Sequence, residues 1–152
     1  MKIVVQLEAF NPGEQLDNFR DQLKSSGALV SFSGMVRDIP GGLAKIKIEH
    51  YPGMTEKAIN KICKEACLSW ELEDIMVIHR FGNLKKGELI MMIATAANHR
   101  TNAFEAAEFL MDYLKSRAPF WKKEVSKDHT EWVQAKSTDE AALAAWSRVP
   151  KA

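Results

Sequence analysis

The residues best suited to chemistry are basic groups at the ends of predicted elements. Asn98, His99 and Arg100 lie between an apolar strand pattern and an amphipathic helix pattern. A helix N-terminus presents unpaired N–H groups and a partial positive charge, so His99 and Arg100 would complete a pocket for a phosphate or a carboxylate. The sequence is equally compatible with a simpler interpretation, in which Asn98 caps the helix and its two neighbours are solvated.

A second basic group surrounds an aromatic pair. Lys115 lies in the last turn of the same predicted helix, and Lys122 and Lys123 follow the pair Phe120-Trp121. If the rings exclude water, a lysine among other cations has a lowered pKa and can act as a base, an acid or a nucleophile. Glu124 could hold one lysine in an ion pair. The alternative without catalysis is that these cations only complement the helix dipole, by about 0.3–1 kcal/mol.

Arg37 ends a predicted strand and opens a loop that contains Pro40-Gly41-Gly42. Its planar guanidinium can bind a phosphate through two hydrogen bonds, so it could be a mobile arm over an anion, or simply a surface arginine. Motifs of zinc peptidases, serine hydrolases and P-loop enzymes are absent, and the four histidines have no ligand spacing. Cys63 and Cys67 predict a partly buried helix face and no redox or metal pair.

Composition argues against highly charged or membrane-embedded partners. The 152 residues include 21 Lys and Arg against 20 Asp and Glu, a net charge of +1. Attraction to nucleic acid or to an anionic membrane is therefore not built into the chain, and anion recognition must be local. No apolar stretch approaches the roughly 18 residues of a membrane span, and the short apolar N-terminal run lacks signal-peptide features. We expect one cytoplasmic domain over residues 1–152.

Strand and helix patterns are mixed without a strict strand–helix–strand rhythm. Alternation and apolar runs predict strands at 2–7, 28–36, 45–49, 75–81 and 88–97, a turn at 82–87, and a hairpin of 120–125 with 131–136. Helical spacing predicts helices near 16–23, 55–66, 103–114 and 139–146, with Thr55 as the N-cap of the second and Pro119 ending the third. No glycine-rich loop follows the first strand. The pattern favours an α+β fold over a doubly wound nucleotide-binding fold.

Several sequence words resemble one family. The segment HYPGMTEKA at 50–58 is similar to a motif of molybdopterin synthase large subunits, the MoaE type. Residues 77–80, 97–100 and 103–106 match in the same order, and the longest word covers 111–124. The similarity extends from 33 to 136 and so covers nearly the whole chain.

The resemblance implies a fold, a reaction and partners. The fold would be a single α+β domain of the α/β hammerhead type, with helices packed on a mixed or antiparallel sheet. Two large subunits would form a homodimer within a heterotetramer that includes two small, ubiquitin-like sulfur carriers of the MoaD type. Each carrier ends in a Gly-Gly thiocarboxylate, whose sulfur is transferred to cyclic pyranopterin monophosphate to make the dithiolene of molybdopterin. This sulfurtransferase step needs no cofactor in the large subunit, because molybdenum is inserted later by other proteins.

The resemblance also implies roles for individual residues. Lys115 and Lys122 correspond to the lysines that line the pocket, and Lys115 is the leading catalytic candidate. The substrate-binding candidates are Met35, Val36, Arg37, His99, Arg100, Lys115, Lys122, Lys123 and Glu124. This sequence departs from the family where Met35 replaces a residue that is often basic. Lys136 stands where an arginine that reaches the neighbouring subunit's site is expected, and a lysine keeps the charge but loses the bidentate fork.

Three other functions fit parts of the sequence. A protein- or RNA-binding module could stack bases on the aromatic residues of 120–123 and hold phosphates with the lysines, although the net charge is nearly zero. A lysine-dependent enzyme could form a Schiff base with a phosphorylated carbonyl compound. A relative without catalysis could only bind the small subunit, but the joint presence of the basic candidates argues against that loss.

Overall fold

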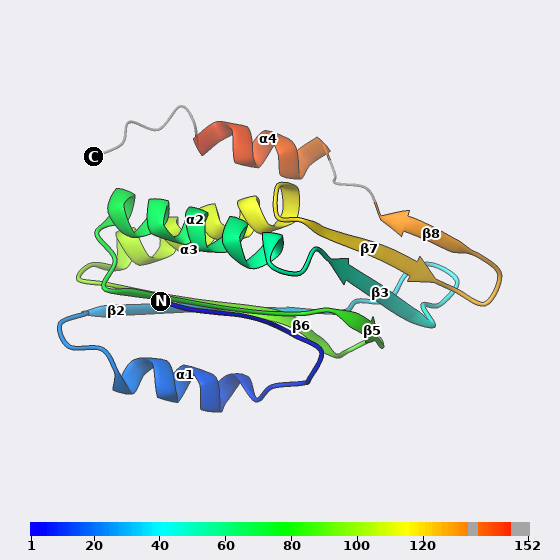
Figure 1. Ribbon diagram of the computed structural model, residues 1–152, viewed down its shortest axis with the longest axis horizontal. Helices are drawn as coiled ribbons and strands as arrows, with labels where there is room; N and C mark the ends of the chain where they lie inside the picture. The colour runs from blue at the N-terminus through cyan, green and yellow to red at the C-terminus, as the bar shows by residue number, and fades with distance from the viewer. Residues whose placement is uncertain (134–136, 147–152) are drawn as a thin grey trace.

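Eight strands and four helices form the part of the chain that the structure, a computed structural model, describes: residues 1–133 and 137–146 (Figure 1). The strands are β1 (Lys2–Gln6), β2 (Ala28–Met35), β3 (Lys45–His50), β4 (Asp74–Arg80), β5 (Gly82–Leu84), β6 (Leu89–Ala97), β7 (Phe120–Val125) and β8 (Thr130–Val133). The helices are α1 (Pro12–Asp21), α2 (Met54–Trp70), α3 (Arg100–Ser116) and α4 (Ser137–Trp146). None of the described helices is long and apolar enough to cross a membrane.

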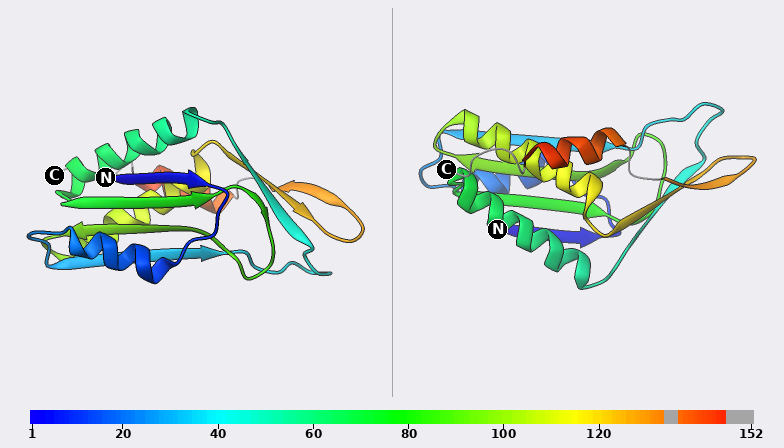
Figure 2. Two further views of the ribbon diagram at one scale, coloured as in Figure 1. Left: turned by 60° about the horizontal axis from the view of Figure 1, so that its bottom comes forward. Right: turned by 90° about the horizontal axis from the view of Figure 1, so that it is seen from above.

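The strands form two four-stranded sheets. The first has the order β1-β4-β6-β2, in which β1 and β4 are parallel and the other pairs antiparallel. The second has the order β5-β3-β7-β8 and is wholly antiparallel. Helix α1 covers one face of the first sheet, α2 and α3 cover the other, and α4 lies outside α3 (Figures 1 and 2). The expected α+β class is confirmed, with two sheets in place of one.

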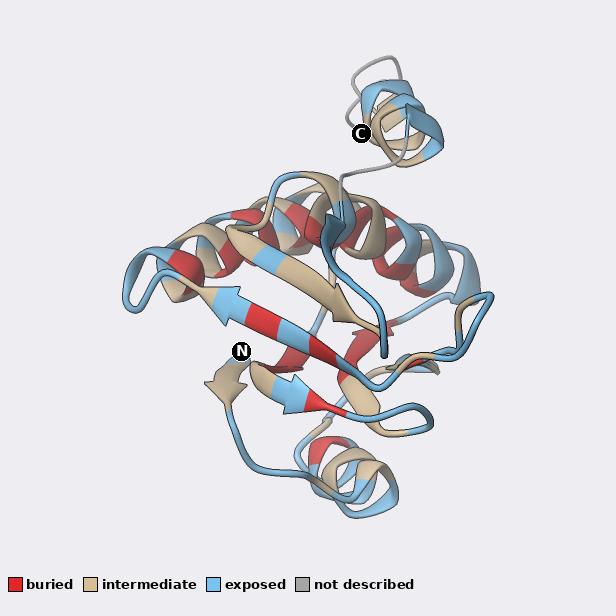
Figure 3. Cartoon of the chain, turned by 90° about the vertical axis from the view of Figure 1, so that its right-hand side faces the viewer, coloured by how far each residue is buried: buried red, intermediate tan, exposed pale blue. Residues whose placement is uncertain are grey.

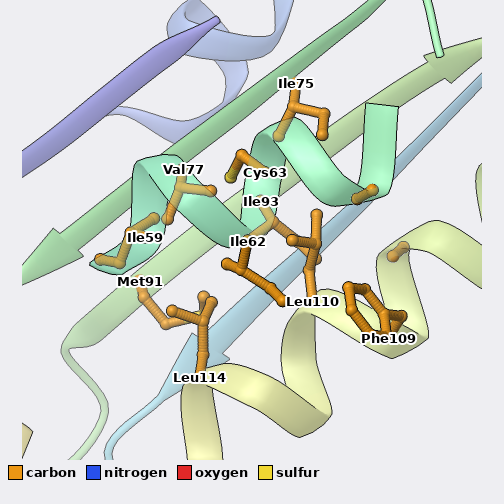
Figure 4. Close-up of a cluster of buried hydrophobic side chains, with 12 residues drawn as sticks. Ile59, Ile62, Cys63, Ile75, Val77, Met91, Ile93, Phe109, Leu110 and Leu114 are labelled. Atoms are coloured by element: carbon orange, nitrogen blue, oxygen red, sulfur yellow. The ribbon is translucent and has the colours of Figure 1, made fainter. Parts of the chain in front are cut away.

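The main core lies between α2, α3 and the first sheet. Apolar residues recur every three or four positions along both helices, so each presents one stripe to the sheet. Ile59, Cys63 and Leu110 meet Val77 and Ile93 there, all of them completely buried (Figure 4). A smaller cluster under α1 contains Phe19. As expected, the two cysteines lie on a helix face, with Cys63 buried and Cys67 half-buried.

The second sheet has one wet face and one packed face. Buried and exposed residues alternate strictly from Lys45 to Glu49 along β3 (Figure 3). Ile46 and Ile48 face inward, where they join Val36 and Leu84 in a third apolar cluster between the sheets. This packing fixes which side chains of the neighbouring strand β7 also point inward, because facing residues of paired strands share a face of the sheet.

Several predicted boundaries were wrong. Thr55 is not an N-cap: α2 is capped at Gly53, whose φ of 82° suits glycine, and Thr55 is completely buried one residue inside the helix. The expected turn at 82–87 begins with strand β5, which pairs with β3 and therefore belongs to the second sheet. The second hairpin strand begins at Thr130, and its predicted continuation through 134–136 lies outside the described residues.

Candidate active site

Strand β7 directs the aromatic and basic residues of 120–125 to opposite faces of the second sheet. Phe120, Lys122 and Glu124 pair with His50, Ile48 and Ile46 of β3, so they belong to the inner face. Trp121 and Lys123 belong to the outer face, where Lys123 Nζ lies 5.0 Å from the centroid of the Trp132 ring. The cluster on which base stacking was considered is therefore not one continuous surface.

Lys122 lies in a partly buried position on the inner face of β7. Its side chain is half-buried, and burial lowers its pKa below the ordinary value. The charge of Lys115 lowers it further, whereas the carboxylate of Asp139 opposes both effects. Lys115 itself is exposed in the last turn of α3. The two predicted catalytic lysines come from different elements, and the charge of Lys115 acts on the pKa of Lys122.

A buried histidine supports the strand that carries Lys122. The ring of His79 stacks on that of Phe120, with centroids 3.7 Å apart and planes 16° from parallel. Burial lowers the pKa of His79 to about 3, so the ring is neutral near pH 7. Its Nδ1 lies 2.8 Å from the carbonyl oxygen of Arg80. Phe120 is thus the aromatic residue that excludes water on the inner face, whereas the Trp121 ring is 46% exposed.

The remaining candidates near the lysines lie in different surroundings. Val36 is buried in the cluster between the sheets, but Met35 is 63% exposed and Arg37 is exposed. Glu124 forms no ion pair with Lys122 or Lys123 within residues 1–133 and 137–146, so the expected pairing is not found. It faces Ile46 on one side and Glu131 on the other.

The loop after Arg37 is closed by one carboxylate. Asp38 accepts hydrogen bonds from the N–H of Leu43 (2.8 Å), the Nζ of Lys86 (3.0 Å) and the N–H of Ile39 (2.9 Å). These bonds, led by that of Leu43, lower the pKa of Asp38 to about 2. The loop that was expected to be a flexible arm is therefore held together at Asp38, the residue that follows Arg37.

His99 and Arg100 lie at the start of α3. His99 is the N-cap and makes no side-chain capping hydrogen bond, so the simpler alternative, in which Asn98 caps the helix, is not found. A shallow pocket opens here, lined by Gly27, Ala28, Asn98, His99, Arg100 and Thr101. The exposed basic side chains of His99 and Arg100 and the helix N-terminus form an arrangement that favours an anion.

The two groups of candidates lie at opposite ends of α3. Arg100 is its first residue and Lys115 belongs to its last turn, so 15 residues separate them, or about 22 Å at 1.5 Å per residue. Arg37 belongs with the lysines, because β2 runs antiparallel to β6 and ends beside the second sheet. Within one chain, therefore, the anion pocket and the lysines do not form a single site. Lys136 lies outside the described residues.

Sequence reasoning missed several residues that build this site. Thr55 links the start of α2 to the segment before β7, because its Oγ1 accepts from Tyr51 N (3.0 Å) and donates to Pro119 O (3.2 Å). Two buried polar atoms near the lysines, His50 Nδ1 and Ser116 Oγ, have no partner among the described residues. That part of the chain also contains no group of three or more His, Cys, Asp or Glu side chains able to hold a metal ion.

Comparison with known proteins identifies the family. The family model described as MoaE protein matches residues 5–117. The molybdopterin synthase catalytic subunit of Cereibacter sphaeroides is 57% identical over 146 residues, which are 96% of this chain and all of that protein. A solved MoaE protein from Burkholderia ambifaria has a TM-score of 0.83 at 46% identity, covering 96% of this chain and 97% of its own. A complex of subunits 1 and 2 of molybdopterin-converting factor from Helicobacter pylori shares the fold, with a TM-score of 0.75 at 20% identity over 89% of this chain and 92% of that one. The chain therefore belongs to the MoaE family of molybdopterin synthase catalytic subunits.

Proposed function

We propose that this chain, as one domain over residues 1–152, is the catalytic subunit of a cytoplasmic molybdopterin synthase. It transfers sulfur from the thiocarboxylate of a small ubiquitin-like carrier to cyclic pyranopterin monophosphate. The observation that carries the proposal is the half-buried Lys122 on the inner face of β7, with its lowered pKa and with Lys115 as a charged neighbour. Two cations in a partly dry site suit a reaction whose reactants are both anions.

The lysines act on a nucleophile that is already ionised. The thiocarboxylate sulfur attacks the pterin side chain and forms a carbon–sulfur bond, while a carbon–oxygen bond breaks. Water then hydrolyses the resulting thioester, which leaves the sulfur on the pterin and the carrier with an ordinary carboxylate. Lys115, which is exposed at the mouth of the site, orients the sulfur and stabilises the developing oxyanion. Lys122, with its lowered pKa, releases a proton to the leaving oxygen more readily than a solvated lysine would.

The substrate phosphate requires further cations, and a second copy of the chain supplies them. Arg100, Phe104, Glu108, Met111 and Lys115 recur every three or four residues, so they form one stripe along α3. Helix α3 lies between α2 and the sheet edge at β2 (Figure 2), and the residues hydrogen-bonded to Trp70 of α2 are Asn102 and Glu105, which lie outside this stripe. Phe104 is 60% exposed on it, and Phe32 of β2 is 44% exposed. If two copies pair these stripes antiparallel about a twofold axis, Arg100 of each lies opposite Lys115 of the other.

The site then has one part from each copy. Arg37, Lys115 and Lys122 from one copy face the carrier tail and the reacting carbons, and His99 and Arg100 from the other bind the phosphate. The carrier is of the MoaD type and ends in a Gly-Gly thiocarboxylate, as the similarity to MoaE proteins implies. A homodimer with two carriers makes a heterotetramer. A two-subunit complex in the same fold is consistent with this arrangement.

The test reconstitutes the reaction. The chain is mixed with cyclic pyranopterin monophosphate and a thiocarboxylated carrier, and molybdopterin is measured for the native protein, Lys115→Ala and Arg100→Ala. Both variants should lose most of the activity. Mixing the two inactive variants should restore about a quarter of it, because random exchange makes half of the dimers mixed and each mixed dimer has one intact site. Activity that does not return on mixing would place all groups in one chain and refute the shared site.

A further inference from the structure

Glu73, in the segment between α2 and β4, holds the segment that leads into β2. Its carboxylate accepts hydrogen bonds from the N–H groups of Lys24 and Ser25 and from the hydroxyls of Ser25 and Ser26. These contacts, with the Ser26 hydroxyl first, lower the pKa of Glu73 to about 2. Its own N–H donates to Ala96 O at 2.8 Å, which ties it to the end of β6.

The segment held by Glu73 forms one wall of the anion pocket. Gly27 follows Ser26 directly and lines the pocket with Asn98 and His99. A Cβ atom on Gly27 would lie 2.7 Å from the carbonyl oxygen of Asn98, closer than real contacts allow, so only glycine fits without moving that backbone. The backbone of Asn98 leads directly to His99 and Arg100. The position of 24–27 thus limits where the side chains of His99 and Arg100 lie.

We propose that Glu73 is a positioning residue for phosphate recognition: through the segment 24–27 it fixes the backbone at 98–100 and thereby the directions of His99 and Arg100. This inference rests on the proposed function, in which these two residues bind the substrate phosphate. Glu73 does not touch the substrate. The adjacent segment, and not Glu73 itself, faces the pocket.

Electrostatics and positioning predict opposite effects for a substitution that removes the charge. A carboxylate near an anion pocket repels the anion, so neutralising it would tighten binding if charge alone mattered. Glu73→Gln keeps the size of the side chain, but its amide NH2 is a donor and cannot accept from Ser25. The segment would then be released and phosphate affinity would fall. The sign of the change therefore separates the two explanations.

The experiment uses the full chain and inorganic phosphate. Chemical shifts of the His99 ring and the Arg100 amide are followed by NMR during titration, and Kd is measured for the native protein, Glu73→Gln and Glu71→Gln. Glu71 is the matched control, because it is exposed two residues earlier and its side chain makes no hydrogen bond or ion pair among the described residues, while its backbone N–H caps α2 by donating to Cys67 O. Glu73→Gln should raise Kd roughly tenfold, whereas Glu71→Gln should leave it within about twofold. In the reconstituted reaction, Glu73→Gln should raise KM for the pterin by a similar factor and leave kcat nearly unchanged.

Each result has one interpretation. If native protein shows no phosphate-dependent shift at His99 and Arg100, the assignment of these residues to phosphate fails, and the role of Glu73 fails with it. If the native protein binds but Glu73→Gln binds equally or more tightly, only the role of Glu73 is refuted. Should Glu73→Gln prove unfolded by circular dichroism, Ser26→Ala removes one of the four hydrogen bonds and should raise Kd by a smaller factor. An unchanged Kd in that folded variant would also overturn the proposal.

Discussion

Replacing Thr55 with valine removes one buried hydroxyl that joins two segments of the site. The hydroxyl accepts from Tyr51 N and donates to Pro119 O, and the side chain is completely buried. Valine has nearly the same shape, so the packing is kept and both backbone groups lose their partner. Each lost hydrogen bond costs about 1 kcal/mol, and the two backbone groups left without a partner add part of their desolvation cost. Thr55→Val should therefore lower the free energy of unfolding by about 2–3 kcal/mol. For a chain of this size, that is a fall in Tm of roughly 4–12 °C.

Urea unfolding at 25 °C measures this difference directly, provided that the slope m is the same in both proteins. Thr55→Ser is the control, because it keeps the hydroxyl and loses one methyl group, a change of about 1 kcal/mol. If valine costs less than serine, or changes the free energy of unfolding by under about 0.5 kcal/mol, the link to Pro119 does not stabilise the fold and the reasoning is refuted.

Four further outcomes follow from the same contacts. Burial and the charge of Lys115 lower the pKa of Lys122 in the folded protein below its ordinary value of 10.5. The charged side chain therefore lowers the free energy of unfolding by its full amount at pH values below the folded-state pKa. This destabilisation disappears as the pH rises towards 10.5. Lys122→Met should therefore raise the free energy of unfolding at neutral pH, with a gain that shrinks towards pH 10.5 in urea titrations. Asp139→Asn removes the charge that opposes the shift, so the basic limb of the pH–rate profile should move to lower pH; an unmoved limb would exclude Lys122 as the titrating group. Trp146→Phe loses the 2.7 Å hydrogen bond to Asp112, worth about 1.5–3 kcal/mol, and limited proteolysis within 137–146 should become faster while cleavage elsewhere does not. Burial raises the pKa of the Cys63 thiol to about 12, so mass spectrometry should find it unmodified by iodoacetamide until the protein is unfolded, and rapid labelling of the folded protein would contradict its burial.

Most elements could be predicted because their apolar residues follow a single period. The stripe of α2 and the alternation of β3 each fix one buried face, and both were confirmed. Strand β5 could not be predicted, since three residues are too few to show a period and its pairing with β3 depends on tertiary contacts. The N-cap of α2 was misassigned because Thr55 is a good capping residue by type, yet its hydroxyl is used in a longer-range contact with Pro119.

The candidate site was predicted in its composition but not in its arrangement. The proximity of Lys122 to Lys115 depends on the short connection from α3 to β7, which the sequence indicates only through Pro119 and the strand pattern after it. That Phe120 and Trp121 lie on opposite faces follows from the pleat once the strand is known. The roughly 22 Å between Arg100 and Lys115 also follows from helix geometry, but only after both are placed on one helix. The role of Glu73 has no local signal, because its partners are nearly 50 residues earlier in the chain.

The parallel pairing of β1 with β4 affects the order in which the protein can mature during translation. Lys2 aligns with Met76, so the first strand emerges from the ribosome 74 residues before its partner. At 5–20 residues per second, β1 remains without its partner for roughly 4–15 s. An apolar segment that stays unpaired for this time is accessible to chaperones and to neighbouring nascent chains. Since β1 is an edge strand, the remainder of the first sheet can assemble before it joins. Late docking of the earliest-made segment is therefore the expected final step in completing this sheet.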